Sequence, residues 1–347
     1  MTVSLSDFGN ESPLSHFLTA SRETVELSTA RKLNSFAMKL VDGTFIELKR
    51  LYMNHTARLT LEATIKKIEG AYAPSTIRAY KSNFESFIKF CDENNTAALP
   101  ASNEIVASYI KKLSSHLKSS SIKIAIASVA AIHNLNSLKD PTQHPDVKIE
   151  MRRMYRTLGR YAKQAYGINK DLLDKMVAAT EDSLRGVRDK AILLVAYDSL
   201  CRRSELVSLE FEDISIEEKS IKLKLRKSKT DPHGVGKNLY LCSEAQHALK
   251  DWIDRSKISS GKIFRAITVT GKIKDSLNSS HIGRIYKKIA KLSKVDQSII
   301  KNISGHSLRV GAAQDLTASG ASLPIIMNRG RWSKTDTVIR YIENYLS

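Results

Sequence analysis

The sequence contains no long hydrophobic run and few cysteines, and each absence excludes a class of protein. No apolar run approaches the ~20 residues that cross a bilayer, and the first residues lack the basic and apolar regions of a signal peptide. The three cysteines, Cys91, Cys201 and Cys242, are far apart and odd in number, which argues against a disulfide framework. We interpret them as small buried apolar residues and expect a cytoplasmic protein.

Motifs for small cofactors are also missing. There is no glycine-rich phosphate loop and no cluster of His, Cys and carboxylates with metal-ligand spacing, so we expect neither a cofactor nor a metal ion. Acidic residues are scarce relative to basic ones, because 36 Asp and Glu face 55 Lys and Arg, giving a formal net charge of +19. The basic residues recur along the whole chain, so we expect a polyanionic partner, with nucleic acid the leading candidate.

At 347 residues the chain is long enough for two domains. Residues 1–53 carry no recognisable chemistry, and we take them as an N-terminal extension of unknown role. Residues 54–163 show one amphipathic helix after another, which indicates a helical domain. Residues 168–347 mix strands with helices, two of which are expected at 243–256 and 280–292. The expected fold is therefore mainly α with a small antiparallel sheet.

Two groups of basic residues in the helical domain are candidates for DNA contact. Arg78 and Lys81 lie off the apolar stripe of the helix that starts at Pro74. The arginines of the second group, which is interleaved with a tyrosine, are Arg152, Arg153, Arg156 and Arg160. A solvated face is the simpler interpretation of such a charge run. In so basic a chain, contact with the DNA backbone is at least as good a hypothesis.

A basic strand face is a third candidate surface. Residues 214–216 and 221–226 have strand patterns. The basic residues that alternate with apolar ones in the second strand are Lys222, Lys224 and Arg226. One face therefore belongs to the core, and the other can lie along DNA or simply face solvent. A turn with Lys227 and Lys229 follows, and a third strand is expected at 239–241.

An arginine pair follows a long apolar helical stretch, residues 191–200. Arg202 and Arg203 follow this stretch after one intervening residue, and Glu205 lies three residues after Arg202. A buried helix leading to this point would hold at least one guanidinium in a fixed place, and Glu205 would orient it. The planar fork of arginine donates two hydrogen bonds to a phosphate and stays charged when partly dehydrated, which suits an anion site better than lysine.

The C-terminal residues carry a second set of anion-binding groups. His306 and Arg309 are three residues apart at the expected start of a helix. They place an imidazole and a guanidinium where backbone N–H groups and the helix dipole also favour an anion. The small residues 311–313 leave room for a neighbouring element. A turn at Trp332 and a last helix with Tyr341, nine residues later, complete the series.

This series resembles the catalytic signature of the tyrosine recombinase (phage integrase) family. The residues that follow the family's order are Arg202, Glu205, Lys229, His306, Arg309, Trp332 and Tyr341. The resemblance covers residues 60–345 and implies a C-shaped clamp of a core-binding domain, 54–163, and a catalytic domain, 168–347, around double-stranded DNA. It also implies a monomer in solution that forms a homotetramer on two recombination sites with inverted repeats, at the nucleoid of a prokaryote.

The resemblance assigns chemistry to these residues. The Tyr341 hydroxyl would attack a phosphodiester, form a 3′-phosphotyrosyl link and leave a free 5′-hydroxyl. Glu205 would hold Arg202, and Lys229 would protonate the leaving oxygen. The groups that would stabilise charge on the non-bridging oxygens are Arg202, Arg309, His306 and Trp332. Two rivals stay open, because Tyr345 lies one helical turn after Tyr341 and Lys227 lies two residues before Lys229.

Three other functions are consistent with parts of the sequence. A type IB topoisomerase shares the covalent chemistry but relaxes supercoils without joining two sites. An integrase that requires arm-type DNA sites is expected to have an additional N-terminal DNA-binding module, and residues 1–53 show no clear motif for one. A non-catalytic DNA-binding regulator would explain the charge and the helices but not the ordered Arg, Lys, His, Arg, Trp and Tyr.

Overall fold

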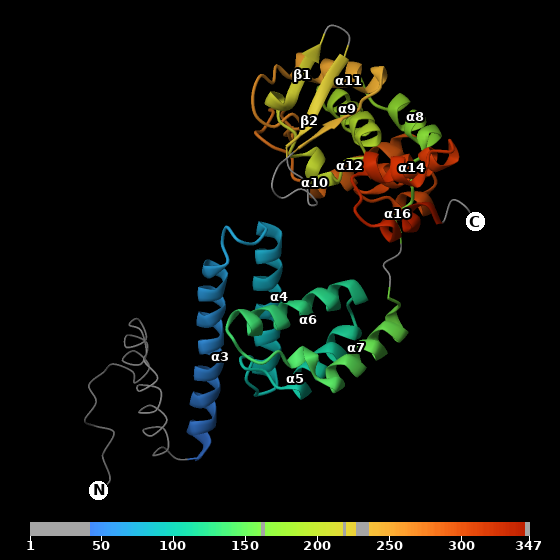
Figure 1. Ribbon diagram of the computed structural model, residues 1–347. Coiled ribbons are helices and arrows are strands. Elements are labelled where there is room, and N and C mark those ends of the chain that lie inside the picture. The colour runs from blue at the N-terminus through green and yellow to red at the C-terminus, as the bar shows by residue number, and fades with distance from the viewer. Residues whose placement is uncertain (1–41, 161–163, 218–219, 227–235, 344–347) are drawn as a thin grey trace, which may run out of the picture. The chain divides into compact units, whose positions relative to one another are not determined.

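A computed structural model of the protein describes residues 42–160, 164–217, 220–226 and 236–343 (Figure 1). The chain divides into two compact units between residues 162 and 163. The described part of the chain is mostly helical and contains one antiparallel sheet of three strands. The expected fold class, mainly α with a small antiparallel sheet, is therefore confirmed. None of the described helices is long and apolar enough to cross a membrane.

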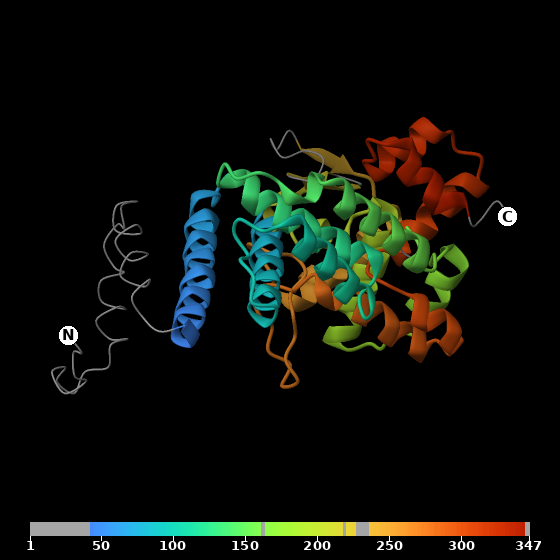
Figure 2. The ribbon, with the colours of Figure 1, turned by 90° about the horizontal axis from the view of Figure 1, so that it is seen from below.

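The first unit is a bundle of amphipathic helices. The elements described there are α3 (Asp42–Lys67), α4 (Pro74–Glu93), α5 (Asn103–Ser114), α6 (Ser119–Leu135), the 3₁₀ turn η3 (Pro141–Gln143) and α7 (Pro145–Leu158). Helix α3 lies beside α4 (Figures 1 and 2), α4 packs on α6, and α5 packs on α7. Helix α3 continues through the expected domain boundary between residues 53 and 54, because residues 44–67 contain neither Gly nor Pro.

Local sequence explains where these helices begin and which face they bury. Pro74 occupies the first turn of α4, where its missing N–H costs no hydrogen bond. The Ser102 side chain accepts a hydrogen bond from the backbone N–H of Ile105 at 3.4 Å and so caps α5. The apolar faces meet in one core, whose most buried members include Phe84, Phe87, Val106, Ile122 and Val129.

The second unit combines ten short helices and turns with the sheet, within the described residues. The helices are α8 (Lys170–Ala178), α9 (Leu184–Ser199), α10 (Arg203–Leu206), the 3₁₀ turn η4 (Phe211–Asp213), α11 (Ser243–Ser256), α12 (Ser280–Leu292), α13 (Gln297–Asn302), α14 (Ser307–Ala318), α15 (Leu323–Gly330) and α16 (Thr335–Ile342). Helix α9 packs against α11, α14 and α8, and its side chains are buried nearly all round. Helices α11 and α12 have the bounds expected from the sequence.

The sheet consists of β1 (Ile214–Glu217), β2 (Ser220–Leu225) and β3 (Lys237–Leu239), in the order β1-β2-β3. Leu223 pairs with Ile214 on one side and with Leu239 on the other. The predicted alternation of β2 is confirmed, because Leu223 and Leu225 are buried while Lys222 and Lys224 are exposed. The third strand was expected two residues later, at 239–241. Pairing with β2 ends at Leu239, because the backbone N–H of Ile221, which lies opposite residue 241 in this register, donates to Gln246 Oε1 at 2.8 Å. The residue after Leu239, Tyr240, is 73% exposed.

The cysteines follow the expectation with one exception. Cys91 and Cys201 are buried, as small apolar residues would be. Cys242 is exposed, so its predicted burial was wrong. The reason is its place as the residue that caps α11, outside the helix core, where its backbone N–H donates to Asp198 Oδ2 at 2.8 Å.

The segment that enters the second unit lies tightly against α14. The backbone N–H of Ile168 donates to the carbonyl of Ser307 at 3.0 Å. A Cβ atom at Gly311 would lie only 1.8 Å from the Ile168 carbonyl oxygen, so no other residue fits there without displacing the segment. The small residues after Arg309 therefore make room for a neighbouring element, as predicted.

Candidate active site

The site is built around the corner that follows α9. Leu200 ends the helix with a φ of 50°, in the left-handed region, and this turns the chain toward α10. Arg202 stands immediately before α10, and its backbone N–H donates to Glu205 Oε2 at 3.0 Å. Its guanidinium Nη1 donates to Glu205 Oε1 at 2.5 Å. Glu205 therefore fixes both ends of Arg202, whose side chain keeps 19% of its surface exposed.

Glu205 is an ionised carboxylate in a buried place, with only 4% of its side chain exposed. Burial alone would raise the pKa of Glu205. The backbone N–H of Arg202 and the guanidinium groups of Arg331 and Arg202 outweigh burial, so the pKa lies below its usual value. The carboxylate is thus charged at neutral pH and can orient cations.

Arg309, on the first turn of α14, is 2% exposed. Its guanidinium donates to the carbonyl of Leu200 and, at 2.6 Å, to the carbonyl of Gly330. Its Cζ lies 4.1 Å from the centre of the Trp332 ring, a cation–π contact. Burial and the nearby charge of Arg202 lower the pKa of Arg309 to about 10, so the group stays protonated at neutral pH.

Trp332 and Tyr341 belong to one small core. Trp332 is 7% exposed, and its ring centre lies 5.5 Å from that of the half-buried Tyr341. Gly330 makes this packing possible, because a Cβ there would lie 1.8 Å from the Trp332 ring. The carbonyl of Tyr341 accepts hydrogen bonds from Gln164 Nε2 at 3.0 Å and Gln314 Nε2 at 3.2 Å. The Tyr341 phenol also lies near enough to influence the pKa of Arg309.

His306 precedes α14 and is half-buried. Its Nδ1 is buried and has no hydrogen-bond partner among the described residues. Burial, followed by the charges of Arg203, Arg309 and Arg202, lowers the pKa of His306, so the imidazole is neutral at pH 7. A neutral ring in this position can accept a proton.

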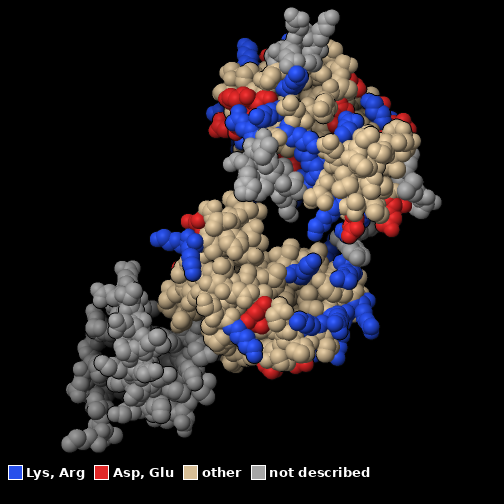
Figure 3. All heavy atoms as spheres, in the orientation of Figure 1, with Lys and Arg blue, Asp and Glu red and all other residues tan. Residues whose placement is uncertain are grey.

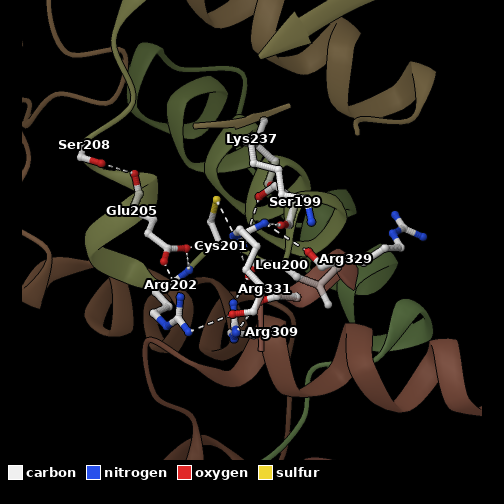
Figure 4. Close-up of polar contacts among 12 residues, drawn as sticks. Ser199, Leu200, Cys201, Arg202, Glu205, Ser208, Lys237, Arg309, Arg329 and Arg331 are labelled. Atoms are coloured by element: carbon white, nitrogen blue, oxygen red, sulfur yellow. Dashed lines mark hydrogen bonds and ion pairs between the residues drawn. The ribbon is translucent and has the colours of Figure 1, made fainter. Parts of the chain in front are cut away.

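Two basic residues near this site were not singled out by the sequence analysis (Figure 4). Arg331 donates to Glu205 Oε2 and to the carbonyls of Ser199 and Leu200. Lys237, at the start of β3, donates to the carbonyl of Asn328 at 2.9 Å, and burial and Arg331 lower the pKa of Lys237. The only signal for Arg331 in the sequence was its place directly before Trp332.

The remaining predicted residues fall into two groups. Lys227, Lys229 and Tyr345 lie outside the described residues. The predicted DNA contacts are exposed, and they are Arg78, Lys81, Arg152, Arg153, Arg156, Arg160, Lys222, Lys224 and Arg226. Lysine and arginine side chains gather over α7 in Figure 3. Arg153 donates to Glu150 at 2.9 Å, and Arg226 donates to Asp213 and, at 3.0 Å, to Glu210.

The electrostatic character of the site follows from these contacts. Arg202 and Arg331 bind one carboxylate, Glu205, and Arg309 shares the Leu200 carbonyl with Arg331, so the cluster is net positive and suits an anion. Among the described residues, no group of three or more His, Cys, Asp and Glu is arranged to hold a metal ion.

Comparison with known proteins identifies the family of the chain. Residues 167–346 match the model of the phage integrase family, and residues 67–135 match that of the phage integrase N-terminal SAM-like domain. An integrase/recombinase XerD homolog of Selenomonas ruminantium is 28% identical over 319 residues, covering 89% of this chain and 92% of that protein. Recombinase Cre of Escherichia phage P1 is 27% identical over 292 residues, covering 79% and 85%.

Solved structures share the fold. The XerH site-specific recombinase, in a post-cleavage complex with palindromic difH substrate, superposes with a TM-score of 0.58 at 14% identity, covering 87% of this chain and 86% of that chain. The Tn1549 transposon integrase, in complex with transposon right-end DNA, gives a TM-score of 0.59 at 12% identity, covering 81% and 94%. Since the family model covers more than half of the sequence, the chain belongs to the phage integrase family of tyrosine recombinases and is a tyrosine-type site-specific recombinase.

Proposed function

We propose that the enzyme cleaves and rejoins DNA through a 3′-phosphotyrosyl intermediate on Tyr341, and that four protomers join two target sites. The observation that carries this proposal is the meeting of two arginines, a tryptophan and a tyrosine at the corner after α9. Arg309 lies against the Trp332 ring, Trp332 lies against Tyr341, and Arg309 shares the Leu200 corner with Arg202.

In the proposed first step the Tyr341 oxygen forms a bond to phosphorus and the bond from phosphorus to the 5′ oxygen breaks. The tyrosine proton passes to a base, for which the neutral His306 is suited. The departing 5′ oxygen takes a proton from an acid, for which Lys229 is the candidate. The 5′-hydroxyl of the partner DNA then attacks the phosphotyrosine and gives its proton to Lys229, and Tyr341 recovers its proton from His306. Each step exchanges one phosphoester for another, so no nucleotide cofactor is needed.

The arginines would stabilise the transition state. Negative charge builds on the non-bridging oxygens, and fixed guanidinium groups stabilise it without having to reorganise. Arg202 is held by Glu205 and keeps an exposed part from which to reach a phosphate. Arg309 has backbone carbonyls on two sides and the Trp332 ring against it, so its position is set before DNA binds.

We propose that exposed basic residues of both units hold the DNA backbone. Arg152 and Arg156 stand off the buried stripe of α7, which is formed by Val147, Glu150 and Met154. Lys222 and Lys224 line the exposed face of β2. Arg153 and Arg226 are partly neutralised by their carboxylates and are weaker candidates. Each lost phosphate contact should make the negative slope of log affinity against log salt less steep by about 0.9.

Substitution of the nucleophile tests the proposal. A DNA substrate can be selected from a pool of randomised duplexes by recovering protein–DNA adducts that survive denaturant. Tyr341→Phe should bind this duplex and form no adduct, whereas the control Tyr345→Phe should form it normally. An adduct formed by Tyr341→Phe would contradict the assignment. Relaxation of a supercoiled plasmid without recombinant products would instead indicate a topoisomerase.

A further inference from the structure

Arg331 has a backbone conformation that arginine rarely adopts. Its φ is 56°, in the left-handed region, where it caps the C-terminus of α15. Glycine is the usual residue at such a cap, because a side chain there crowds the backbone. Favourable contacts of the arginine side chain must therefore offset the strain.

Those contacts lead to the corner after α9. The Arg331 side chain is only 6% exposed. Nη1 donates to the carbonyl of Ser199 at 3.0 Å, and Nη2 donates to the carbonyl of Leu200 at 3.1 Å and to Glu205 Oε2 at 3.0 Å. Figure 4 shows the side chain between these groups. One planar guanidinium thus ties the end of α15 to both sides of the corner.

The contacts between Arg331 and Arg202 close a ring. The carbonyl of Arg331 accepts a hydrogen bond from Arg202 Nη2 at 3.4 Å. Glu205 completes the ring, because one of its oxygens binds Arg331 at 3.0 Å and the other binds Arg202 at 2.5 Å. The next residue after Arg331 is Trp332, whose ring lies over Arg309. A shift of Arg331 would therefore move Arg202 and Trp332 together.

We infer that Arg331 is a positioning residue for strand cleavage, an inference that rests on the proposed function. Both of its Nη atoms donate to protein oxygens, among them Glu205 Oε2 at 3.0 Å, so it acts through Glu205 and Arg202 rather than on the phosphate. Lysine could not replace it, because a single ammonium on a flexible stem lacks the fork that spans the Ser199 carbonyl and the Glu205 carboxylate.

The substitution Arg331→Gly separates the two roles of this residue. Glycine suits the left-handed cap and removes the backbone strain, but it deletes every contact of the guanidinium. We expect Arg331→Gly to bind the adduct-selected duplex as the unsubstituted protein does. At saturating DNA its rate of adduct formation should fall on the order of 10²-fold, because misplaced catalytic groups cost about that much. The matched control is Arg329→Gln, which removes an equal charge from the same helix end but leaves the ring intact.

The outcomes distinguish this inference from the proposed function. A wild-type cleavage rate in folded Arg331→Gly would overturn the positioning role, as would an equal loss in Arg329→Gln. If thermal unfolding shows that Arg331→Gly does not fold, the rate of adduct formation is measured instead for Arg331→Lys, which keeps the buried charge. A wild-type rate in this variant would also overturn the positioning role. Absence of any adduct with the unsubstituted protein would overturn the proposed function, and this inference with it.

Discussion

Replacing Glu205 by alanine should destabilise the second unit strongly. The carboxylate accepts hydrogen bonds from the Arg202 N–H at 3.0 Å, from Arg202 Nη1 at 2.5 Å and from Arg331 Nη2 at 3.0 Å. In Glu205→Ala two guanidinium groups would remain close together without their shared counter-charge. The cost therefore includes repulsion between the arginines as well as the lost hydrogen bonds.

The size of the effect follows from burial. Removing one partner of a buried ion pair costs about 3–5 kcal/mol of unfolding free energy. Arg202 keeps 19% of its side chain exposed, so water can replace part of the loss, and we expect about 3 kcal/mol, the low end of that range. The control is Glu244→Ala. Glu244 pairs with Lys170 at 3.2 Å but is 46% exposed, so its loss should cost less than about 1 kcal/mol.

The effect should depend on pH with a defined sign. The folded pKa of Glu205 is lowered, so its carboxylate stabilises the fold above the unfolded pKa of about 4.3. That stabilisation is lost as the pH falls through the folded pKa. The difference between the unsubstituted protein and Glu205→Ala should therefore be complete at pH 7 and should shrink below about pH 4.

Urea unfolding followed by tryptophan fluorescence measures this difference. Both tryptophans of the chain, Trp252 and Trp332, lie in the second unit, so the signal reports on the unit that contains Glu205. A change of less than about 1 kcal/mol at pH 7 would refute the argument that Glu205 is the counter-charge of the cluster. A difference of the same size at low pH would show that lost packing, not lost charge, causes the destabilisation.

Three further predictions concern other parts of the molecule. His133 is buried, its Nε2 accepts the Ala101 N–H, and burial lowers its pKa. As the pH falls below about 6.5, the unfolding free energy of the first unit should therefore fall by up to about 1.4 kcal/mol per pH unit. Urea titrations followed by circular dichroism measure this slope, which should be absent in His133→Gln. Gln164→Ala and Gln314→Ala each remove one of two hydrogen bonds to the Tyr341 carbonyl. Each substitution should slow adduct formation by about fivefold without weakening DNA binding. Unchanged rates would show that α16 is held by packing alone. Lys229→Ala should regain much of its cleavage rate on a substrate with sulfur at the 5′ bridging position, and rescue of Lys227→Ala instead would move the acid to Lys227.

Elements with a strong local pattern were predictable from the sequence. Helices α11 and α12 begin and end where the sequence analysis placed them, since their apolar periodicity and their starting serines agree. β3 was placed two residues late, because its position depends on pairing with β2 rather than on its own side chains. The sequence predicts the order of four site residues but not the distances between them in the fold. These residues are Arg202, Arg309, Trp332 and Tyr341.

Contacts between side chains and backbone carbonyls could not be predicted from the sequence. Arg309 donates to Leu200 and Gly330, which are 109 and 21 residues away, and neither partner contributes a side-chain signal. Arg331 was missed for the same reason, because its partners include the carbonyls of Ser199 and Leu200. A buried arginine at a left-handed position cannot be distinguished from an ordinary turn residue until the distant corner is known.

Backbone carbonyls also explain how the site stays positive while its cations are buried. The last carbonyls of a helix lack partners within the helix and form the negative end of its dipole. Helix α9 presents the carbonyls of Ser199 and Leu200, and α15 presents those of Gly330 and Arg331, to the guanidinium groups. These carbonyls satisfy the arginine N–H groups without cancelling a full charge. One carboxylate is then enough to order Arg202 and Arg331, while carbonyls alone accept from Arg309, and the remaining positive charge is left for an anion such as a DNA phosphate.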